Sequence, residues 1–223
     1  MSERNQLTLS STRRQRERNE MVARIKDIAR NMFVREGYEA VTLQKIATAL
    51  EYTRPSLYRY FKDKRELLAA IVVEDMKDLH VVLLQCAKVA DPLRRLRNMA
   101  RRNTEWALAH PNHYLLFYSQ AWREYEDPVR GDLGIPLSEE PLSILYATVG
   151  EMISRGMIKQ KYEDPSLIAR TLWAGMHGVI MLEITMSGYD KSLIRENRRP
   201  ALQSIDIMFQ SLMNGFLKNS EMC

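Results

Sequence analysis

Apolar residues recur at intervals of three and four positions along most of the chain, and this periodicity constrains the fold more than any other feature. One such stripe, within residues 20–36, consists of Ile25, Ile28, Ala29, Met32 and Phe33. No segment alternates apolar and polar residues between tight turns, as a half-buried strand would. We therefore expect an all-α fold of about nine helices without an internal repeat.

Capping and helix-breaking residues predict where these helices begin and end. Thr42, Thr53 and Asp91 are suited to N-cap positions, Pro55 to the first turn of a helix, and Gly37 to the left-handed position after one. The expected helices cover about 20–36, 43–50, 54–61, 64–89, 92–110, 111–125, 139–156, 165–188 and 200–217, with a loop at 126–138.

The positive charge lies entirely in the first third of the chain. Residues 1–68 carry 15 Lys and Arg against 9 Asp and Glu, and the remainder carries 18 against 19, for a net charge of +5. This asymmetry favours a basic head that binds a polyanion and a body with another role. A chance fluctuation with a solvated tail is the alternative.

Neither a membrane span nor a secretion signal is expected. The longest nearly continuous apolar run, 172–182, is too short to cross a bilayer, and residues 1–20 hold five arginines and few apolar side chains. Cys86 and Cys223 are too few for a disulfide framework or a zinc cluster. We expect a cytoplasmic protein without cofactor or metal.

Two short predicted helices, joined by residues 51–53 and followed by a longer one, form the pattern of a helix-turn-helix. The expected organisation is a basic flexible arm at 1–19, a DNA-binding domain at 20–66, and a ligand-binding and dimerisation domain at 67–223.

The segment from Thr42 to Leu68 closely resembles the TetR family of bacterial transcriptional regulators. The motifs that carry the resemblance are Ile46-Ala47, Leu57-Tyr58-x-x-Phe61 and Lys64-x-Glu66-Leu67, after a helix that ends in Gly37-Tyr38. In the C-terminal part, Trp173-x-x-x-His177-Gly178 is similar to a signature of one group of TetR-type domains. The chain departs from the family at Glu51 and Pro55, where Gly is common, so either Glu51 adopts a positive φ or the turn has a slightly different shape.

The resemblance implies a non-enzymatic repressor that binds a palindromic operator as a homodimer and is released by a small hydrophobic ligand. In the recognition helix, Arg54 is placed to pair with guanine, and Tyr58 matches a family position that reaches a phosphate. Thr42 and Lys64, at helix N-termini, are placed to hold phosphates. The complete predicted DNA-binding set is Thr42, Lys45, Thr53, Arg54, Ser56, Tyr58, Arg59, Tyr60 and Lys64.

Several of these residues have a simpler interpretation. Thr42 and Thr53 are ordinary N-caps in the first place, and the nearby Lys62 can be a solvated charge. The arginines at 13–18 form either a minor-groove or backbone arm or a solvated tail.

The C-terminal part offers residues for a ligand pocket and for a dimer interface. The predicted pocket residues are aromatic, methionine and histidine side chains, namely Trp106, Tyr114, Phe117, Tyr118, Trp122, Met152, Trp173, Met176, His177 and Met181. The predicted interface residues are Gly175, Gly178, Met186, Ile205, Met208, Phe209, Leu212, Met213 and Phe216. The simpler interpretation is that both sets form the core of the monomer, with His177 as an ordinary buried histidine.

Two other function classes are alternatives to a ligand-controlled repressor. A helical-bundle enzyme is disfavoured because the sequence lacks a Gly-x-Ser-x-Gly motif, a phosphate-binding glycine loop and a His-Glu-x-x-His motif. His110 and His113 are close in sequence, but no carboxylate follows at the spacing of a metal ligand. A TetR-like regulator controlled by a protein partner, or a passive repressor, is the second alternative.

Overall fold

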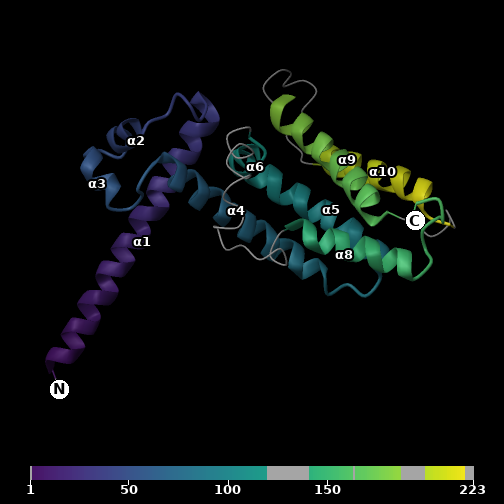
Figure 1. The fold of residues 1–223 in the computed structure, drawn as a ribbon, viewed down its shortest axis with the longest axis horizontal. Helices are drawn as coiled ribbons and strands as arrows, with labels where there is room; N and C mark the ends of the chain where they lie inside the picture. The colour runs from purple at the N-terminus through teal and green to yellow at the C-terminus, as the bar shows by residue number, and fades with distance from the viewer. Residues whose placement is uncertain (1, 120–140, 163, 187–198, 219–223) are drawn as a thin grey trace. The chain divides into compact units, whose positions relative to one another are not determined.

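A computed structural model of the chain describes residues 2–119, 141–162, 164–186 and 199–218. Within these ranges the protein is helical, which confirms the all-α expectation (Figure 1). The described helices are α1 (Ser2–Glu36), α2 (Leu43–Ala49), α3 (Arg54–Tyr58), α4 (Lys64–Cys86), α5 (Pro92–Ala109), α6 (Pro111–Phe117), α8 (Pro141–Ser154), α9 (Pro165–Met186) and α10 (Arg199–Phe216). Each corresponds to one expected helix.

The start of α1 corrects the prediction. This helix begins at Ser2 rather than near residue 20, so the segment expected to be a flexible arm is helical. Residues 2–36 contain neither Gly nor Pro, and two side-chain pairs one turn apart support the extension. The Arg13 Nε donates to Glu17 Oε1 at 2.8 Å, and the Gln15 Nε2 donates to Asn19 Oδ1 at 2.9 Å.

One other helix end differs from the prediction, and a second lies outside the described residues. The recognition helix α3 ends at Tyr58, not near Phe61, although the Phe61 N–H still donates to the Leu57 carbonyl at 3.1 Å. The expected helix end near residue 125, the loop at 126–138, Trp122 and Cys223 lie outside the described residues.

Gly37 takes the predicted left-handed position, and at Glu51 the structure shows the positive φ that was one of two expected alternatives. Gly37 has φ +84°, and Glu51 has φ +61°. At the end of α2, the Glu51 N–H donates to the Thr48 carbonyl at 3.0 Å, and the Tyr52 N–H donates to the Ala47 carbonyl at 2.9 Å. These two bonds form a Schellman motif, which requires a left-handed residue where Glu51 stands.

The chain divides into two compact units, one of residues 1–74 and 115–133 and the other of residues 75–114 and 134–223. In the first unit, the buried core comes mainly from α1, α2, α3 and the first half of α4, and it includes Ile25, Ala29, Phe33, Ile46, Leu57, Phe61, Leu68 and Ile71. In the second unit, a larger core joins the last turns of α4 to α5, α8, α9 and α10, with Met152, Ile205 and Met213 fully buried.

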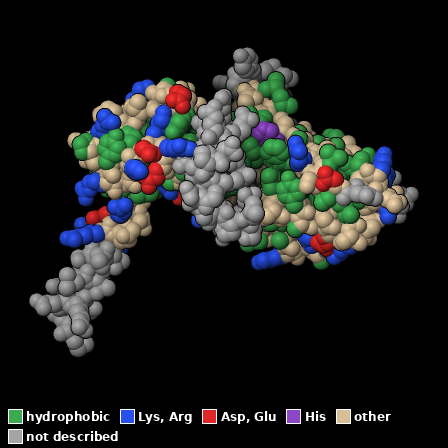
Figure 2. All heavy atoms as spheres, viewed as in Figure 1, with side chains coloured by type: hydrophobic (Ala, Val, Ile, Leu, Met, Phe, Trp, Pro, Cys, Tyr) green, Lys and Arg blue, Asp and Glu red, His purple; other side chains and the backbone are tan. Residues whose placement is uncertain are grey.

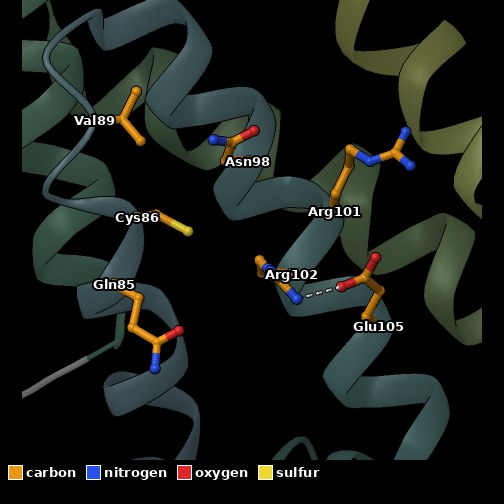
Figure 3. A pocket seen from close by; sticks show the side chains of 7 residues that line it. All are labelled: Gln85, Cys86, Val89, Asn98, Arg101, Arg102 and Glu105. Carbon is orange, nitrogen blue, oxygen red and sulfur yellow. Dashed lines mark hydrogen bonds and ion pairs between the residues drawn. The ribbon is translucent and has the colours of Figure 1, made fainter.

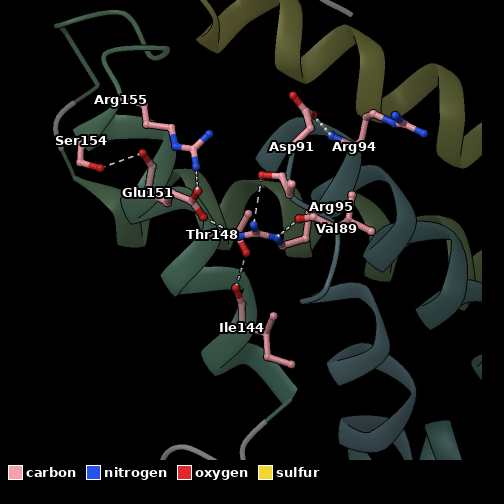
Figure 4. A network of polar contacts seen from close by, with 10 residues as sticks. Val89, Asp91, Arg94, Arg95, Ile144, Thr148, Glu151, Ser154 and Arg155 are labelled. Atoms are coloured by element: carbon pink, nitrogen blue, oxygen red, sulfur yellow. Dashed lines mark hydrogen bonds and ion pairs between the residues drawn. The ribbon is translucent and has the colours of Figure 1, made fainter.

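A network of polar contacts supports the second unit where α5 and α8 meet (Figure 4). The Arg95 guanidinium donates to Glu151 Oε2 at 2.5 Å and to the Val89 carbonyl at 2.9 Å, which ties α8 to the turn before α5. Arg155 pairs with the other oxygen of Glu151, also at 2.5 Å. The side chains of Arg95 and Glu151 are 14% and 27% exposed, so this carboxylate is held by two guanidinium groups in a partly desolvated position.

Among the described residues, α9 is the one helix whose length and apolar composition match those of a membrane-crossing helix, with a mean hydropathy of 1.3. The core helix of a globular protein meets the same test, and Ile168, Leu172 and Ile180 of α9 are buried in the second unit. Several other apolar residues of α9 are exposed.

Candidate nucleic-acid interface

The recognition helix α3 separates its apolar and polar side chains cleanly. Leu57 is 1% exposed, and Phe61, just after the helix, is also buried, so both anchor α3 in the core of the first unit. Arg54, Tyr58 and Arg59 are exposed, Tyr58 by 45%. A helix held from one face presents the other face to a partner, and this face is formed by predicted DNA-binding residues.

Within that face, Arg54 and Tyr58 contact each other across one helical turn. The Arg54 guanidinium donates to the Tyr58 hydroxyl, at 2.8 Å from Nη2 and 3.2 Å from Nε, and lies 5.5 Å from the ring centroid. The two side chains are therefore ordered together before any partner binds. Thr53 has N-cap dihedrals but makes no capping hydrogen bond, because its hydroxyl lies 2.8 Å from that of Ser56.

Thr42 and Lys45 lie at the start of α2. The Thr42 Oγ1 accepts from the Lys45 N–H at 3.2 Å, which confirms the predicted N-cap. The Lys45 ammonium donates to Glu36 Oε2 at 3.0 Å and to the Ala40 carbonyl at 2.9 Å. Lys45 thus fastens the first turn of α2 to the end of α1, with half of its side chain still exposed.

Lys64, at the start of α4, was expected to hold a phosphate, but its side chain also makes contacts within the protein. Its ammonium donates to the Tyr38 carbonyl at 2.7 Å and lies 4.0 Å from the centroid of the Tyr38 ring. The helix start is also capped by carboxylates, since the Glu66 N–H donates to Asp63 Oδ1 at 2.7 Å and the Glu66 carboxylate accepts from the Lys62 N–H. A phosphate at Lys64 would compete with these contacts.

One contact of this surface was missed by sequence reasoning. The Arg18 guanidinium of α1 lies 5.4 Å from the ring centroid of Tyr60, just beyond α3. The two residues are far apart in sequence, and the only sequence signal was the run of arginines. Figure 2 shows Lys and Arg side chains along the described part of α1 and over the visible face of the first unit.

The predicted pocket residues of the second unit include one connected aromatic group. The Tyr114 hydroxyl shares a 2.8 Å hydrogen bond with His177 Nδ1, and the Trp173 ring stacks on His177 with centroids 5.4 Å apart. Burial lowers the pKa of His177. Met176 approaches the Asn103 amide, and Trp106 packs against the core together with Met176. Phe117 and Tyr118, in edge-to-face contact at 4.6 Å, belong to the first unit.

The predicted interface residues fall into two groups. Ile205, Phe209, Met213 and Phe216 are buried within the protomer, so this stripe of α10 closes its own core. Gly175 allows close packing inside the protomer too, because a Cβ there would lie 2.8 Å from the Met208 sulfur. Met208 and Leu212 are partly buried, whereas Gly178 and Met186 are exposed.

Comparison with known proteins agrees with these features. Residues 25–71 match the family described as "Bacterial regulatory proteins, tetR family", and residues 96–212 match "Tetracyclin repressor-like, C-terminal domain". The second match alone covers more than half of the chain. The chain belongs to the TetR family.

Individual TetR relatives add to this assignment in sequence and in fold. An HTH-type transcriptional regulator of Staphylococcus aureus is 34% identical over 68 residues, a match that covers 30% of this chain and 35% of that protein, so the chain spans about a third of such curated relatives. The TetR family regulator PfmR from Thermus thermophilus has a TM-score of 0.66 at 21% identity, covering 83% of this chain and 97% of its own. The fatty acid degradation regulator FadR from Bacillus halodurans has a TM-score of 0.66 at 16% identity, covering 87% and 95%.

The second unit of this TetR-family chain also has a hollow of about 480 Å³ between α4 and α5 (Figure 3). Gln85, Cys86, Val89, Asn98, Arg101, Arg102 and Glu105 line it, and none of them was predicted as a pocket residue. Arg102 pairs with Glu105 at 3.2 Å, and Arg101 pairs with Asp206 of α10. Burial raises the pKa of the Cys86 thiol, which disfavours the reactive thiolate.

His110 and His113, which are close in sequence, both make contacts within the protein. His113 Nδ1 lies 2.8 Å from a carboxylate oxygen of Asp75, which is 1% exposed, and His110 Nδ1 lies 3.0 Å from the Trp106 carbonyl. Within the described residues, no three His, Cys, Asp or Glu side chains are grouped as metal ligands.

Proposed function

We propose that this chain is a transcriptional repressor that binds a palindromic DNA operator as a homodimer and is released when a small hydrophobic ligand binds its C-terminal domain. The observation that carries the proposal is the arrangement of α3, whose buried Leu57 leaves Arg54, Tyr58 and Arg59 exposed on one surface. A short helix anchored in this way fits the major groove, where an arginine can pair with guanine.

The exposed side of α9 supports the homodimer. Along this side the exposed residues follow a spacing of three to four and are apolar or small except for one arginine, and they are Leu167, Arg170, Ala174, Gly178, Leu182 and Met186. Leu182 is 60% exposed, Met186 50% exposed, and Ile207 of the neighbouring α10 68% exposed. Apolar surface of this extent on two packed helices is typical of an interface, and a second copy would form a four-helix bundle with them. Dimerisation places two recognition helices on one operator.

The aromatic group of the second unit supports a ligand. Trp173 and Trp106 offer apolar surface, Met176 is an adaptable side chain, and the Tyr114–His177 pair supplies polar atoms. A compound that binds more tightly to the arrangement of the dimer with the lower operator affinity shifts the population toward that arrangement. The size of the shift is set by the difference in its affinity for the two arrangements, so operator affinity falls by linkage.

DNA binding is tested with a duplex that the wild-type protein enriches from a random-sequence pool. Arg54→Ala should relax the preference at one base pair and weaken binding by about 1–3 kcal/mol, because it removes a base contact. Arg94→Ala, on an exposed position of the second unit, is the matched control for the lost charge and should leave binding unchanged. Failure of the wild type to bind or enrich any duplex would refute the proposal.

The dimer is tested by analytical ultracentrifugation. Leu182→Glu should convert the protein to a monomer, since it places a carboxylate in the apolar interface. Leu84→Glu is the control, because Leu84 is also exposed but lies on α4. Equal sedimentation of the two variants and the wild type as a dimer contradicts an interface at α9.

The ligand is tested by thermal shift with a library of hydrophobic compounds that includes long-chain fatty acids. A binding compound should raise the melting temperature and release the enriched duplex, and His177→Gln should weaken that response. If no compound does both, control by a protein partner replaces this part of the proposal.

A further inference from the structure

The helical extension at the N-terminus of α1 carries its arginines on different faces, and one face continues the buried stripe of the helix. Arg14 and Arg18 precede Ile25 and Ala29 with spacings of four, seven and four residues, which places all four on the same side of α1. Ile25 and Ala29 are both fully buried in the first unit. Arg14 and Arg18 therefore continue the side of α1 that faces the rest of its unit, but they are exposed.

The position of Arg18 relates this face to the recognition helix. Its guanidinium lies 5.4 Å from the centroid of the Tyr60 ring, directly after α3, so the Arg14–Arg18 face lies on the α3 side of α1. Arg14 is four residues further along, about 6 Å at the helical rise. In Figure 1, α1 continues well beyond α2 and α3.

The other two arginines of this segment point elsewhere. Arg16 is two residues from both Arg14 and Arg18, which puts it on the opposite side of the helix. Arg13 is paired with Glu17 at 2.8 Å, so a carboxylate already offsets its charge. The run of arginines is thus divided into a face beside α3 and a face away from it.

We propose that the Arg14–Arg18 face of α1 is a second DNA-binding surface, which contacts the phosphate backbone of the duplex next to the groove that α3 occupies. The inference rests on the proposed DNA binding, and it assigns the role to Arg14 and Arg18 and not to Arg13 and Arg16. Phosphates flank the major groove on both sides. Exposed guanidinium groups one turn apart on the α3 side of α1 suit such a row of phosphates in charge and in hydrogen-bonding geometry.

The surface adds affinity without sequence preference. A phosphate contact neutralises one charge and releases a counterion, so each one steepens the dependence of binding on salt. Because the segment is a helix rather than a disordered arm, Arg14 and Arg18 are held on the α3 side of α1 before binding, and less conformational entropy is lost on binding than for a flexible tail.

The test compares Arg14→Ala with Arg16→Ala, which remove the same charge at exposed positions two residues apart. Binding is measured by fluorescence anisotropy over a range of salt concentrations, on the duplex enriched by the wild-type protein with about one helical turn of flanking DNA on each side. Arg14→Ala should weaken binding roughly fivefold to tenfold and lower the salt slope by about one per bound protomer. Arg16→Ala should bind within about twofold of the wild type, and Arg14→Lys should restore most of the affinity.

A second probe separates a backbone contact from a change in the recognition helix. On duplexes shortened stepwise from the ends, the difference in affinity between Arg14→Ala and the wild type should disappear once the contacted phosphates are removed, whereas a change in the recognition helix would persist at every length that still binds. Equal losses of affinity for Arg14→Ala and Arg16→Ala, or no loss for either, overturn the proposal for this surface. In both cases binding by the wild-type protein still supports the proposed function. If the wild-type protein binds no duplex, the proposed function itself fails.

Discussion

Replacing Glu51 with Gly is expected to stabilise the protein. Glu51 has φ +61°, a left-handed conformation that crowds the Cβ of any residue other than glycine. The Schellman hydrogen bonds at the end of α2 are made by the backbone N–H groups of Glu51 and Tyr52, so the substitution leaves them in place. Only the conformational cost of the side chain is removed.

The magnitude follows from two opposing effects. The left-handed conformation costs a non-glycine residue about 1–2 kcal/mol. Glycine also gains freedom in the unfolded chain, which offsets about 0.4–1 kcal/mol of that benefit. The net gain in the free energy of unfolding is about 0.5–1 kcal/mol, which corresponds to a rise in Tm of roughly 1–4 °C for a chain of this size.

The assay is urea denaturation followed by circular dichroism, with thermal melting as a second measurement. Glu51→Ala is the matched control, because it removes the same charge and keeps the Cβ, and it should change the free energy of unfolding by less than about 0.5 kcal/mol. Gly37→Ala should act in the opposite direction: Gly37 has φ +84°, and no atom lies within 4 Å of an added Cβ, so its cost is purely conformational. Equal stabilities of the Gly and Ala variants at position 51 would refute the reasoning.

Three further substitutions test the second unit. Met152→Ala should lower the free energy of unfolding by about 2–5 kcal/mol, since Met152 is fully buried, and a loss below about 1 kcal/mol in urea denaturation contradicts the core assignment. Glu151→Gln should cost about 1–3 kcal/mol, because Arg95 loses its charged partner in a partly desolvated position; Glu105→Gln, at a more exposed pair, is the control and should cost less. Burial lowers the pKa of His177 from 6.5, so the unfolded chain binds this proton at a higher pH than the folded chain, and wild-type stability should fall as the pH drops below about 6.5. His177→Gln should lose less stability than the wild type between about pH 7 and about pH 5, and parallel profiles would show that His177 does not contribute.

The local features of the fold were predictable because they depend on near neighbours. The caps at Thr42 and Asp91 and the left-handed position at Gly37 follow from residue chemistry over three to five positions, and the structure confirms them. The start of α1 was not predicted, because a polar sequence without Gly or Pro satisfies the rules for a helix and for a solvated tail alike.

The candidate sites were predictable in residue type but not in environment. The exposed face of α3 contains the expected residues, yet the engagement of Lys64 with Tyr38 joins residues 26 positions apart. The apolar stripe of α10 left two interpretations open, and burial of Ile205, Phe209 and Met213 within the protomer favours the core. The sequence showed that the segment forming α9 is unusually apolar, but not which of its apolar side chains are exposed.

The sequence by itself determined the all-α class, the order of the helices and the family of this protein, because hydrophobic period, caps and the TetR motif are local properties of the chain. The tertiary structure decided which Lys and Arg side chains are bonded to other groups of the protein, which arginines lie beside the recognition helix, and which apolar stripes remain exposed. These depend on contacts between residues distant in sequence, such as Arg18 with Tyr60 and Tyr114 with His177. Such contacts are set by the packing of whole helices, which no local pattern encodes.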